Sequence, residues 1–124
     1  HARLGRATRA AVAAWGFDTV CKQPDRHSDS LTAVVMPDGA DAEAFRQRVR
    51  ARFNVAIGNG LGSLAGRVFR IGHLGDMNEP MLIGALSAIE LSLAGCGAQP
   101  EGRGVAAAME TLANETSSAP AGPE

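Results

Sequence analysis

The chain has 124 residues, which is enough for one domain and short for two. With 45% hydrophobic and 20% charged residues and a net charge of −1, it has the balance of a globular protein, without a basic field for nucleic acid or an acidic membrane. Two cysteines exclude a disulfide scaffold and a cysteine-built zinc site, and no apolar run reaches the roughly 18 residues of a membrane span. We therefore expect a cytoplasmic protein.

The first predicted element is a helix over residues 3–14, followed by Gly16 as its C-cap. Its apolar residues share one face at helical spacing, namely Leu4, Ala7, Ala11, Val12 and Trp15. No Ser, Thr, Asp or Asn precedes the pattern to cap it, and the chain starts at His1 rather than Met. These two features favour a piece cut from a longer protein.

Two strands are predicted next, over residues 17–22 and 31–36, and the second ends at a Pro-Asp-Gly turn signal. Asp41 then caps a second helix, whose apolar residues recur at helical spacing: Ala42, Phe45, Val49 and Phe53. The other face of this helix carries the arginines Arg46, Arg48, Arg50 and Arg52. We interpret them as a solvated face rather than a phosphate site, because nearby acids dilute their charge.

A short strand is predicted over residues 55–57, and the most irregular stretch follows it. Six glycines fall within 18 residues: Gly58, Gly60, Gly62, Gly66, Gly72 and Gly75. A strand is predicted inside this stretch, over residues 67–71. Asn78 then caps a third helix over residues 78–94, with Pro80 in its first turn, where a missing N–H costs nothing.

The third helix is apolar nearly all round, which predicts burial on more than one side. Close approach of another element is expected along its stripe of small residues: Gly84, Ala88 and Ser92. A last helix follows Gly104. Because most strands are too close in sequence for helical crossovers, we predict an α+β two-layer sandwich, a small mostly antiparallel sheet covered by helices, over residues 1–113. Residues 114–124 read as a disordered tail.

Two glycine motifs in the chain lack the context that gives such motifs their chemistry. Residues 60–65 match the dinucleotide fingerprint G-x-G-x-x-A, but a strand follows them instead of the required helix. Residues 72–75 match the G-x-x-G loop of KH RNA-binding domains, which joins two helices. Here the loop follows a strand and is succeeded by Asp76, so we expect no nucleic-acid partner.

Arg70 is the most informative charged residue. In a strand over residues 67–71, Phe69 and Ile71 point to one side and Arg70 to the other. An arginine in this setting is held by a carboxylate of the protein or binds one from a ligand, and the residues alone leave both readings open.

The sequence leaves two interpretations of His73 open: a loop histidine whose ring is hydrogen-bonded within the protein, or a catalytic histidine. The histidines His1, His27 and His73 have no metal-ligand spacing. The sequence also lacks a nucleophile elbow, a paired-carboxylate arrangement and a phosphate-binding loop with its lysine.

The run over residues 60–76, G-L-G-S-L-A-G-R-V-F-R-I-G-H-L-G-D, is far more specific than either glycine motif. It resembles the C-terminal small domain of class V, fold-type I aminotransferases, in particular the serine–glyoxylate and alanine–glyoxylate group that uses pyridoxal phosphate. The resemblance extends to residues 26–34, R-H-S-D-S-L-T-A-V, and covers about residues 1–112. It departs at Arg67 and Met77, where the family more often has lysine and phenylalanine.

In that family the arginine of the R-I-G motif binds the substrate's α-carboxylate, and the matching position is Arg70. A planar guanidinium can form two parallel hydrogen bonds with a carboxylate, so the resemblance favours a ligand over an internal ion pair. It also places the loop of residues 58–66, with Gly60 and Gly62, near the active site. His73 is typical of the serine–glyoxylate branch, without an assigned chemical step.

The resemblance implies that the catalytic machinery lies outside this sequence. Pyridoxal phosphate chemistry needs a lysine that binds the cofactor covalently and an acid paired with its ring nitrogen. The chain's one lysine, Lys22, lacks the context of the family's catalytic lysine. We therefore expect a large domain, absent here, to bind pyridoxal 5'-phosphate, and this chain to hold no catalytic, cofactor-binding or metal-binding residue.

The implied parent protein is a transaminase that moves an amino group from serine or alanine to glyoxylate or a similar 2-oxo acid. Its partners would be these small substrates, its own large domain and a second copy in a homodimer. From another class, the alternative is a non-catalytic α+β module that binds small carboxylates or another protein. Within the fold, an aminoethylphosphonate transaminase is a further alternative.

Overall fold

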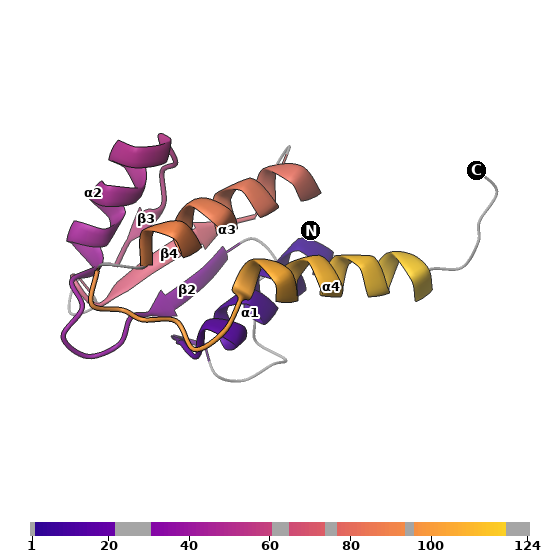
Figure 1. The fold of residues 1–124 in the computed structure, drawn as a ribbon, viewed down its shortest axis with the longest axis horizontal. Coiled ribbons are helices and arrows are strands. Elements are labelled where there is room, and N and C mark those ends of the chain that lie inside the picture. Colours follow the sequence, from indigo (N-terminus) through magenta and orange to yellow (C-terminus); the bar gives the residue numbers. More distant parts are fainter. Residues whose placement is uncertain (1, 22–30, 61–64, 74–76, 94–95, 119–124) are drawn as a thin grey trace.

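The computed structural model describes residues 2–21, 31–60, 65–73, 77–93 and 96–118, with the backbone alone for 115–118. The elements in chain order are α1 (Ala2–Trp15), β1 (Asp18–Thr19), β2 (Leu31–Val35), α2 (Ala42–Phe53), β3 (Gly58–Asn59), β4 (Val68–Gly72), α3 (Glu79–Leu93) and α4 (Gly104–Ser118). Across this part of the chain the strands form a four-stranded sheet in the order β1-β2-β4-β3, with every neighbouring pair antiparallel (Figure 1). The predicted α+β class with an antiparallel sheet is confirmed.

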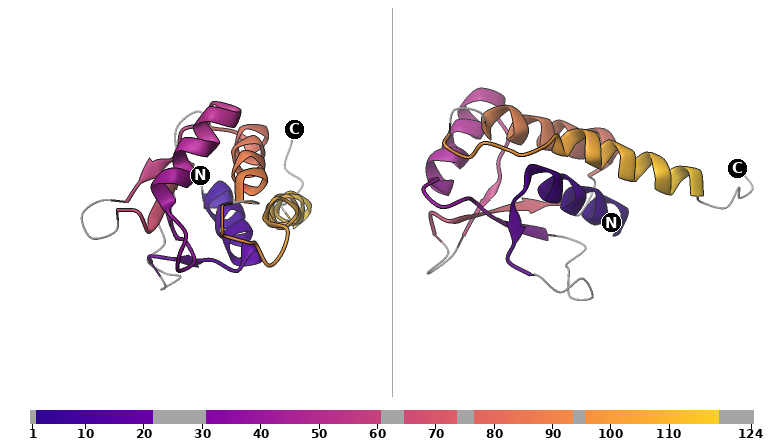
Figure 2. Two further views of the ribbon diagram at one scale, coloured as in Figure 1. Left: turned by 60° about the vertical axis from the view of Figure 1, so that its left-hand side comes forward. Right: turned by 60° about the horizontal axis from the view of Figure 1, so that its bottom comes forward.

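The helices gather on one side of the sheet, as the turned views show (Figure 2). Helices α1 and α2 contact the strands, and α4 packs on α1 and α3. Successive side chains of β2 and β4 therefore point alternately toward the helices and away from them. The side chains that face the helices are buried, namely Thr32, Val34, Phe69 and Ile71. The intervening Ala33 and Arg70 stay partly exposed on the opposite face, here named the open face.

The helix ends follow the predicted signals. Gly16 ends α1 with φ at 82°, in the left-handed region that glycine adopts without strain. At the start of α2, the carboxylate of Asp41 accepts hydrogen bonds from the backbone N–H groups of Glu43 and Ala44 at 2.9 and 3.3 Å. Asn78 likewise caps α3 through the N–H of Met81 at 2.9 Å.

Three predicted boundaries were wrong. The strand β1 spans Asp18–Thr19 rather than 17–22, although the N–H of Val20 still donates to Ala33 at 3.0 Å. The next short strand is Gly58–Asn59 rather than 55–57. The carbonyl of Ile57 accepts a hydrogen bond of 2.7 Å from Nε of an arginine on α2 instead of pairing with a neighbouring strand. Helix α4 continues to Ser118, beyond the expected tail boundary at 113/114, and residues 119–124 lie outside the described ranges.

That α2 arginine is Arg46, and it corrects the expected solvated face. Its Nη1 atom donates to both carboxylate oxygens of Glu43, at 2.8 and 2.7 Å, while its Nε holds Ile57. Arg46 therefore ties α2 to the residue that precedes β3. The other three arginines of this face are exposed, as predicted: Arg48, Arg50 and Arg52.

Of the stripe of small residues on α3, Ala88 and Ser92 are buried, while Gly84 has no close neighbour; α1 and the start of α4 approach closely at Gly104. A Cβ added at Gly84 would meet nothing within 4 Å, whereas one at Gly104 would overlap the indole of Trp15. Glu90 completes this junction, because its Oε1 accepts the indole N–H of Trp15 at 2.7 Å and the backbone N–H of Val105 at 3.0 Å. One carboxylate thus joins α1, α3 and the start of α4. No described helix is both long and apolar enough to cross a membrane.

Candidate functional site

Arg70 lies at the centre of the open face. In the register of the sheet it stands opposite Ala33 on β2 and opposite Gly58 on β3. Partnered residues of an antiparallel pair project to the same side, so these three positions form one row across the sheet. The predicted side of Arg70, opposite to Phe69 and Ile71, agrees with this register and with their burial.

The guanidinium of Arg70 has no partner among the residues that the structure describes. No hydrogen bond or ion pair joins it to any residue that the structure describes, and its Nε is buried without a hydrogen-bond acceptor. The internal ion pair that the sequence left open is therefore not found in this part of the chain. A buried N–H that forms no hydrogen bond is costly, so an acceptor beside this group would be favourable. A carboxylate matches its charge and its paired donors.

Gly58 lies directly beside this guanidinium. A Cβ built on Gly58 would lie 3.1 Å from Nε of Arg70 and 3.3 Å from both its Cβ and Nη2. The arginine side chain therefore packs directly over the bare backbone of Gly58. Sequence reasoning missed this role, since the run of glycines does not indicate which of them pairs with Arg70.

The other predicted site residues have different surroundings. His73 is fully buried, and its Nε2 forms a hydrogen bond of 2.9 Å with the hydroxyl of Thr32, whose side chain faces the helices. The structure therefore does not bring His73 together with Arg70. Gly60 continues the ladder, with its N–H donating to Val68 at 3.1 Å, two residues along β3 from the partner of Arg70. Gly62 lies outside the described residues.

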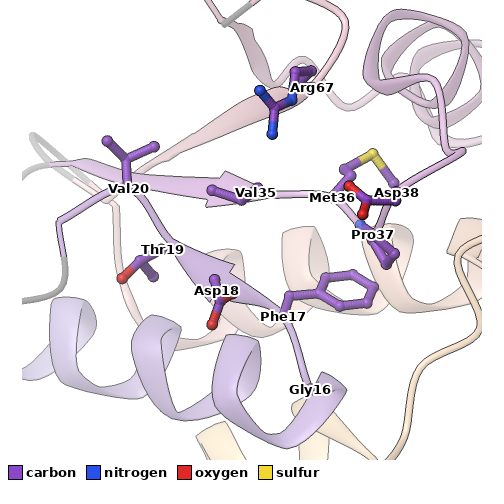
Figure 3. A pocket seen from close by; sticks show the side chains of 10 residues that line it. All are labelled: Gly16, Phe17, Asp18, Thr19, Val20, Val35, Met36, Pro37, Asp38 and Arg67. Atoms are coloured by element: carbon purple, nitrogen blue, oxygen red, sulfur yellow. The ribbon is translucent and has the colours of Figure 1, made fainter.

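A depression of about 510 Å³ lies at the end of β1 and β2 (Figure 3). It is lined by the α1–β1 connection, by Val20 and Val35, by the turn after β2, and by Arg67. Arg70 is not among its lining residues. The charged side chains at its rim, Asp18, Asp38 and Arg67, are exposed, so no buried polar group is directed into it. We assign no function to this depression.

The described residues do not fit a cofactor that needs a lysine. Lys22, the one lysine of the chain, lies outside the described ranges. Within those ranges no group of three or more histidine, cysteine, aspartate or glutamate side chains could hold a metal ion. Among the described residues, Arg70 is the candidate whose chemistry suits binding of an anion.

Known proteins share both the sequence and the fold of this chain. No protein-family model matches it. It is 50% identical over 113 residues to a serine–glyoxylate aminotransferase of Methylorubrum extorquens, covering 90% of this chain and 28% of the relative. It is 43% identical over 123 residues to a serine–glyoxylate aminotransferase of Hyphomicrobium methylovorum, and this match covers 98% of this chain and 30% of the relative. The solved structure of pyridoxamine–pyruvate aminotransferase from Mesorhizobium loti matches with a TM-score of 0.84 and 35% identity, covering 93% of this chain and 30% of that one.

The fold and the sequence together relate the chain to the class V aminotransferases, as one segment that spans less than a third of their length. Within that class its sequence is similar to the glyoxylate aminotransferases. The resemblance of residues 60–76 to this group is thereby confirmed, and the segment has the extent of a small domain.

Proposed function

We propose that this chain, through the end of α4 at Ser118, is the small domain of a transaminase and that Arg70 binds the α-carboxylate of its substrates. These are a small amino acid such as serine or alanine and a small 2-oxo acid such as glyoxylate. The guanidinium of Arg70, whose buried Nε has no acceptor among the described residues, is the observation that carries the proposal. The dimeric assembly and the cytoplasmic setting expected from the resemblance belong to the same proposal.

The names of the relatives support a shared carboxylate. Glyoxylate is named in two of the relatives and pyruvate in the solved structure. Both are 2-oxo acids, in which a carboxylate adjoins the reacting carbonyl carbon. A residue that holds this carboxylate through two parallel hydrogen bonds fixes the direction of the reacting carbon.

Pyridoxal 5'-phosphate, when bound, supplies the electron sink for amino-group transfer. In this proposal a larger part of the protein, beyond these 124 residues, holds it, because the chain spans less than a third of its aminotransferase relatives and its one lysine, Lys22, lacks the context of the family's catalytic lysine. The part played by this chain is binding and orientation. Arg70 neutralises the carboxylate, and the open face of the sheet supplies the surface from which the guanidinium projects.

The test is Arg70→Ala in the full-length enzyme. Loss of a bidentate, charge-assisted contact is worth about 2–4 kcal/mol in a desolvated site, or roughly a 30- to 1000-fold fall in kcat/KM. Both half-reactions should suffer, because donor and acceptor present the same carboxylate. Cofactor absorbance should be unchanged, and Arg70→Lys should recover part of the loss, since an ammonium does not reproduce the planar pair of donors.

Two results would overturn the proposal. Normal kinetics in folded Arg70→Ala enzyme would show that Arg70 binds no substrate. Carboxylate binding by a form of the protein that has no transaminase activity would instead identify the chain as a non-catalytic module.

A further inference from the structure

We propose that Gly58 is a positioning residue: its missing side chain lets the guanidinium of Arg70 lie against β3, in the orientation that receives the substrate carboxylate. The inference rests on the proposed role of Arg70. It adds that the geometry of the carboxylate site is set by a second residue, which makes no contact with the substrate itself.

The crowding around Gly58 involves the anchored part of the arginine as well as its tip. The nearest atoms to an added Cβ would be Nε at 3.1 Å and the Cβ and Nη2 of Arg70 at 3.3 Å. The Cβ of Arg70 is fixed by the paired backbone of β4 and has no freedom to withdraw. An alanine at position 58 therefore requires the side chain of Arg70 to turn beyond its Cβ, and the guanidinium shifts by a few tenths of an ångström.

The strand that carries Gly58 is also held from behind. Arg46 on α2 donates from Nε to the carbonyl of Ile57 at 2.7 Å, and its Nη1 is fixed by both carboxylate oxygens of Glu43. The residue preceding Gly58 is thus attached to α2, while Gly58 itself pairs with Arg70. Because β3 is held on both sides, it cannot move away to relieve a clash, so the displacement falls on the guanidinium.

The chain offers a matched control at Gly72. It lies on the same strand as Arg70, two residues further along and on the same face, and a Cβ there would meet nothing within 4 Å. Neither Gly58 nor Gly72 has the positive φ that would strain an alanine. The pair of substitutions therefore isolates the space beside the guanidinium from the general effect of replacing a strand glycine.

The experiment compares Gly58→Ala, Gly72→Ala, Arg70→Ala and the double variant Gly58→Ala/Arg70→Ala in the full-length enzyme, with glyoxylate as the varied substrate. Displacement of an orienting group by about 1 Å costs on the order of 100-fold in rate, so for a shift of a few tenths of an ångström we expect the KM of Gly58→Ala for glyoxylate to rise about 3- to 10-fold. Gly72→Ala should stay within about twofold of the parent. In the Arg70→Ala background, Gly58→Ala should add nothing, since the group that it displaces is gone.

A thermal unfolding curve for each variant separates positioning from folding. An equal loss of Gly58→Ala activity with and without Arg70, or the same loss in Gly72→Ala, would overturn the inference. So would Gly58→Ala kinetics equal to those of the parent. If Arg70→Ala is impaired and Gly58→Ala is not, this inference fails and the role of Arg70 stands. If Arg70→Ala is itself fully active, the proposed function fails first.

Discussion

The two faces of the sheet are built from alternate residues of the same strands and have opposite properties. On the helix-covered face, Phe69 packs on Phe45 with ring centroids 5.2 Å apart, and the hydroxyl of Thr32 is bonded to His73. On the open face, Arg70 has a buried Nε without an acceptor and lies against a glycine. Among the described residues, the polar groups of the covered face are bonded to one another, whereas the open face keeps a buried guanidinium N–H without an acceptor.

This contrast shows how a small sheet separates stability from recognition. The pleat sends neighbouring residues to opposite sides, so a residue that stabilises the core and one that recognises an anion can be adjacent in sequence. The open face can then carry an unsatisfied cation without placing it in the hydrophobic core. Substitutions on the two faces should accordingly affect different measurements.

The largest effect on folding is expected from Phe69→Ala. Its side chain is fully buried, so truncation removes packing and leaves a cavity, at a cost of about 3–5 kcal/mol in the free energy of unfolding. Arg70→Ala, one residue along the same strand, should change this free energy by less than about 1 kcal/mol. Urea unfolding of both variants measures the difference. An equal fall in the free energy of unfolding for both variants would show that the open face contributes to stability as much as the covered face.

A smaller effect is expected from Thr32→Val, which keeps the shape of the side chain and removes its hydroxyl. The hydroxyl and the His73 imidazole are both buried, so loss of their 2.9 Å hydrogen bond should cost about 1–3 kcal/mol. The control is Thr19→Val, because water can replace the bond from the Thr19 hydroxyl to the partly exposed carbonyl of Cys21, at a cost within about 0.5 kcal/mol. If both variants unfold at the same urea concentration, His73 does not depend on this bond.

The smallest effect on stability is expected from Leu31→Ser on the open face. Leu31 is 37% exposed and Val20 is 44% exposed, and both lie on the side of Arg70. We expect a change within about 0.5 kcal/mol in the free energy of unfolding and weaker self-association of this chain in light scattering, because an exposed apolar patch promotes association. Leu91→Ser, on α3, is the control. If Leu91→Ser reduced self-association and Leu31→Ser did not, the surface through which the chains associate would lie on the helices.

Much of this arrangement could be predicted from local sequence patterns. The side of Arg70 followed from strand alternation, since Phe69 and Ile71 had to share the buried face. The caps at Asp41 and Asn78 followed from side-chain chemistry within one turn. Each of these features depends on residues that are near neighbours in the chain.

Features that depend on distant residues could not be predicted in this way. Pairing across the sheet decides which of six neighbouring glycines meets Arg70, and no single strand carries that register. The burial of His73 did have a local signal, because it lies two residues after Ile71 and so shares its side. Glu90 also had a local signal, because an acidic residue inside a mostly apolar helix indicates a buried polar contact. Its partners, Trp15 on α1 and Val105 on α4, could not be predicted because they are distant in sequence.

The contact between Trp15 and Gly104 has a consequence for the synthesis of the protein. It joins α1 to α4, and these two helices form the most extensive contact between the described elements. During translation, α1 leaves the ribosome before α4, so it must wait for residues 16–103 before its main partner exists. Contacts this distant in sequence also slow folding, because the intervening chain must be ordered before they form. Until α4 emerges, the indole of Trp15 and the apolar face around it lack their cover, so this is the interval in which a chaperone or a misfolded neighbour could bind the nascent chain.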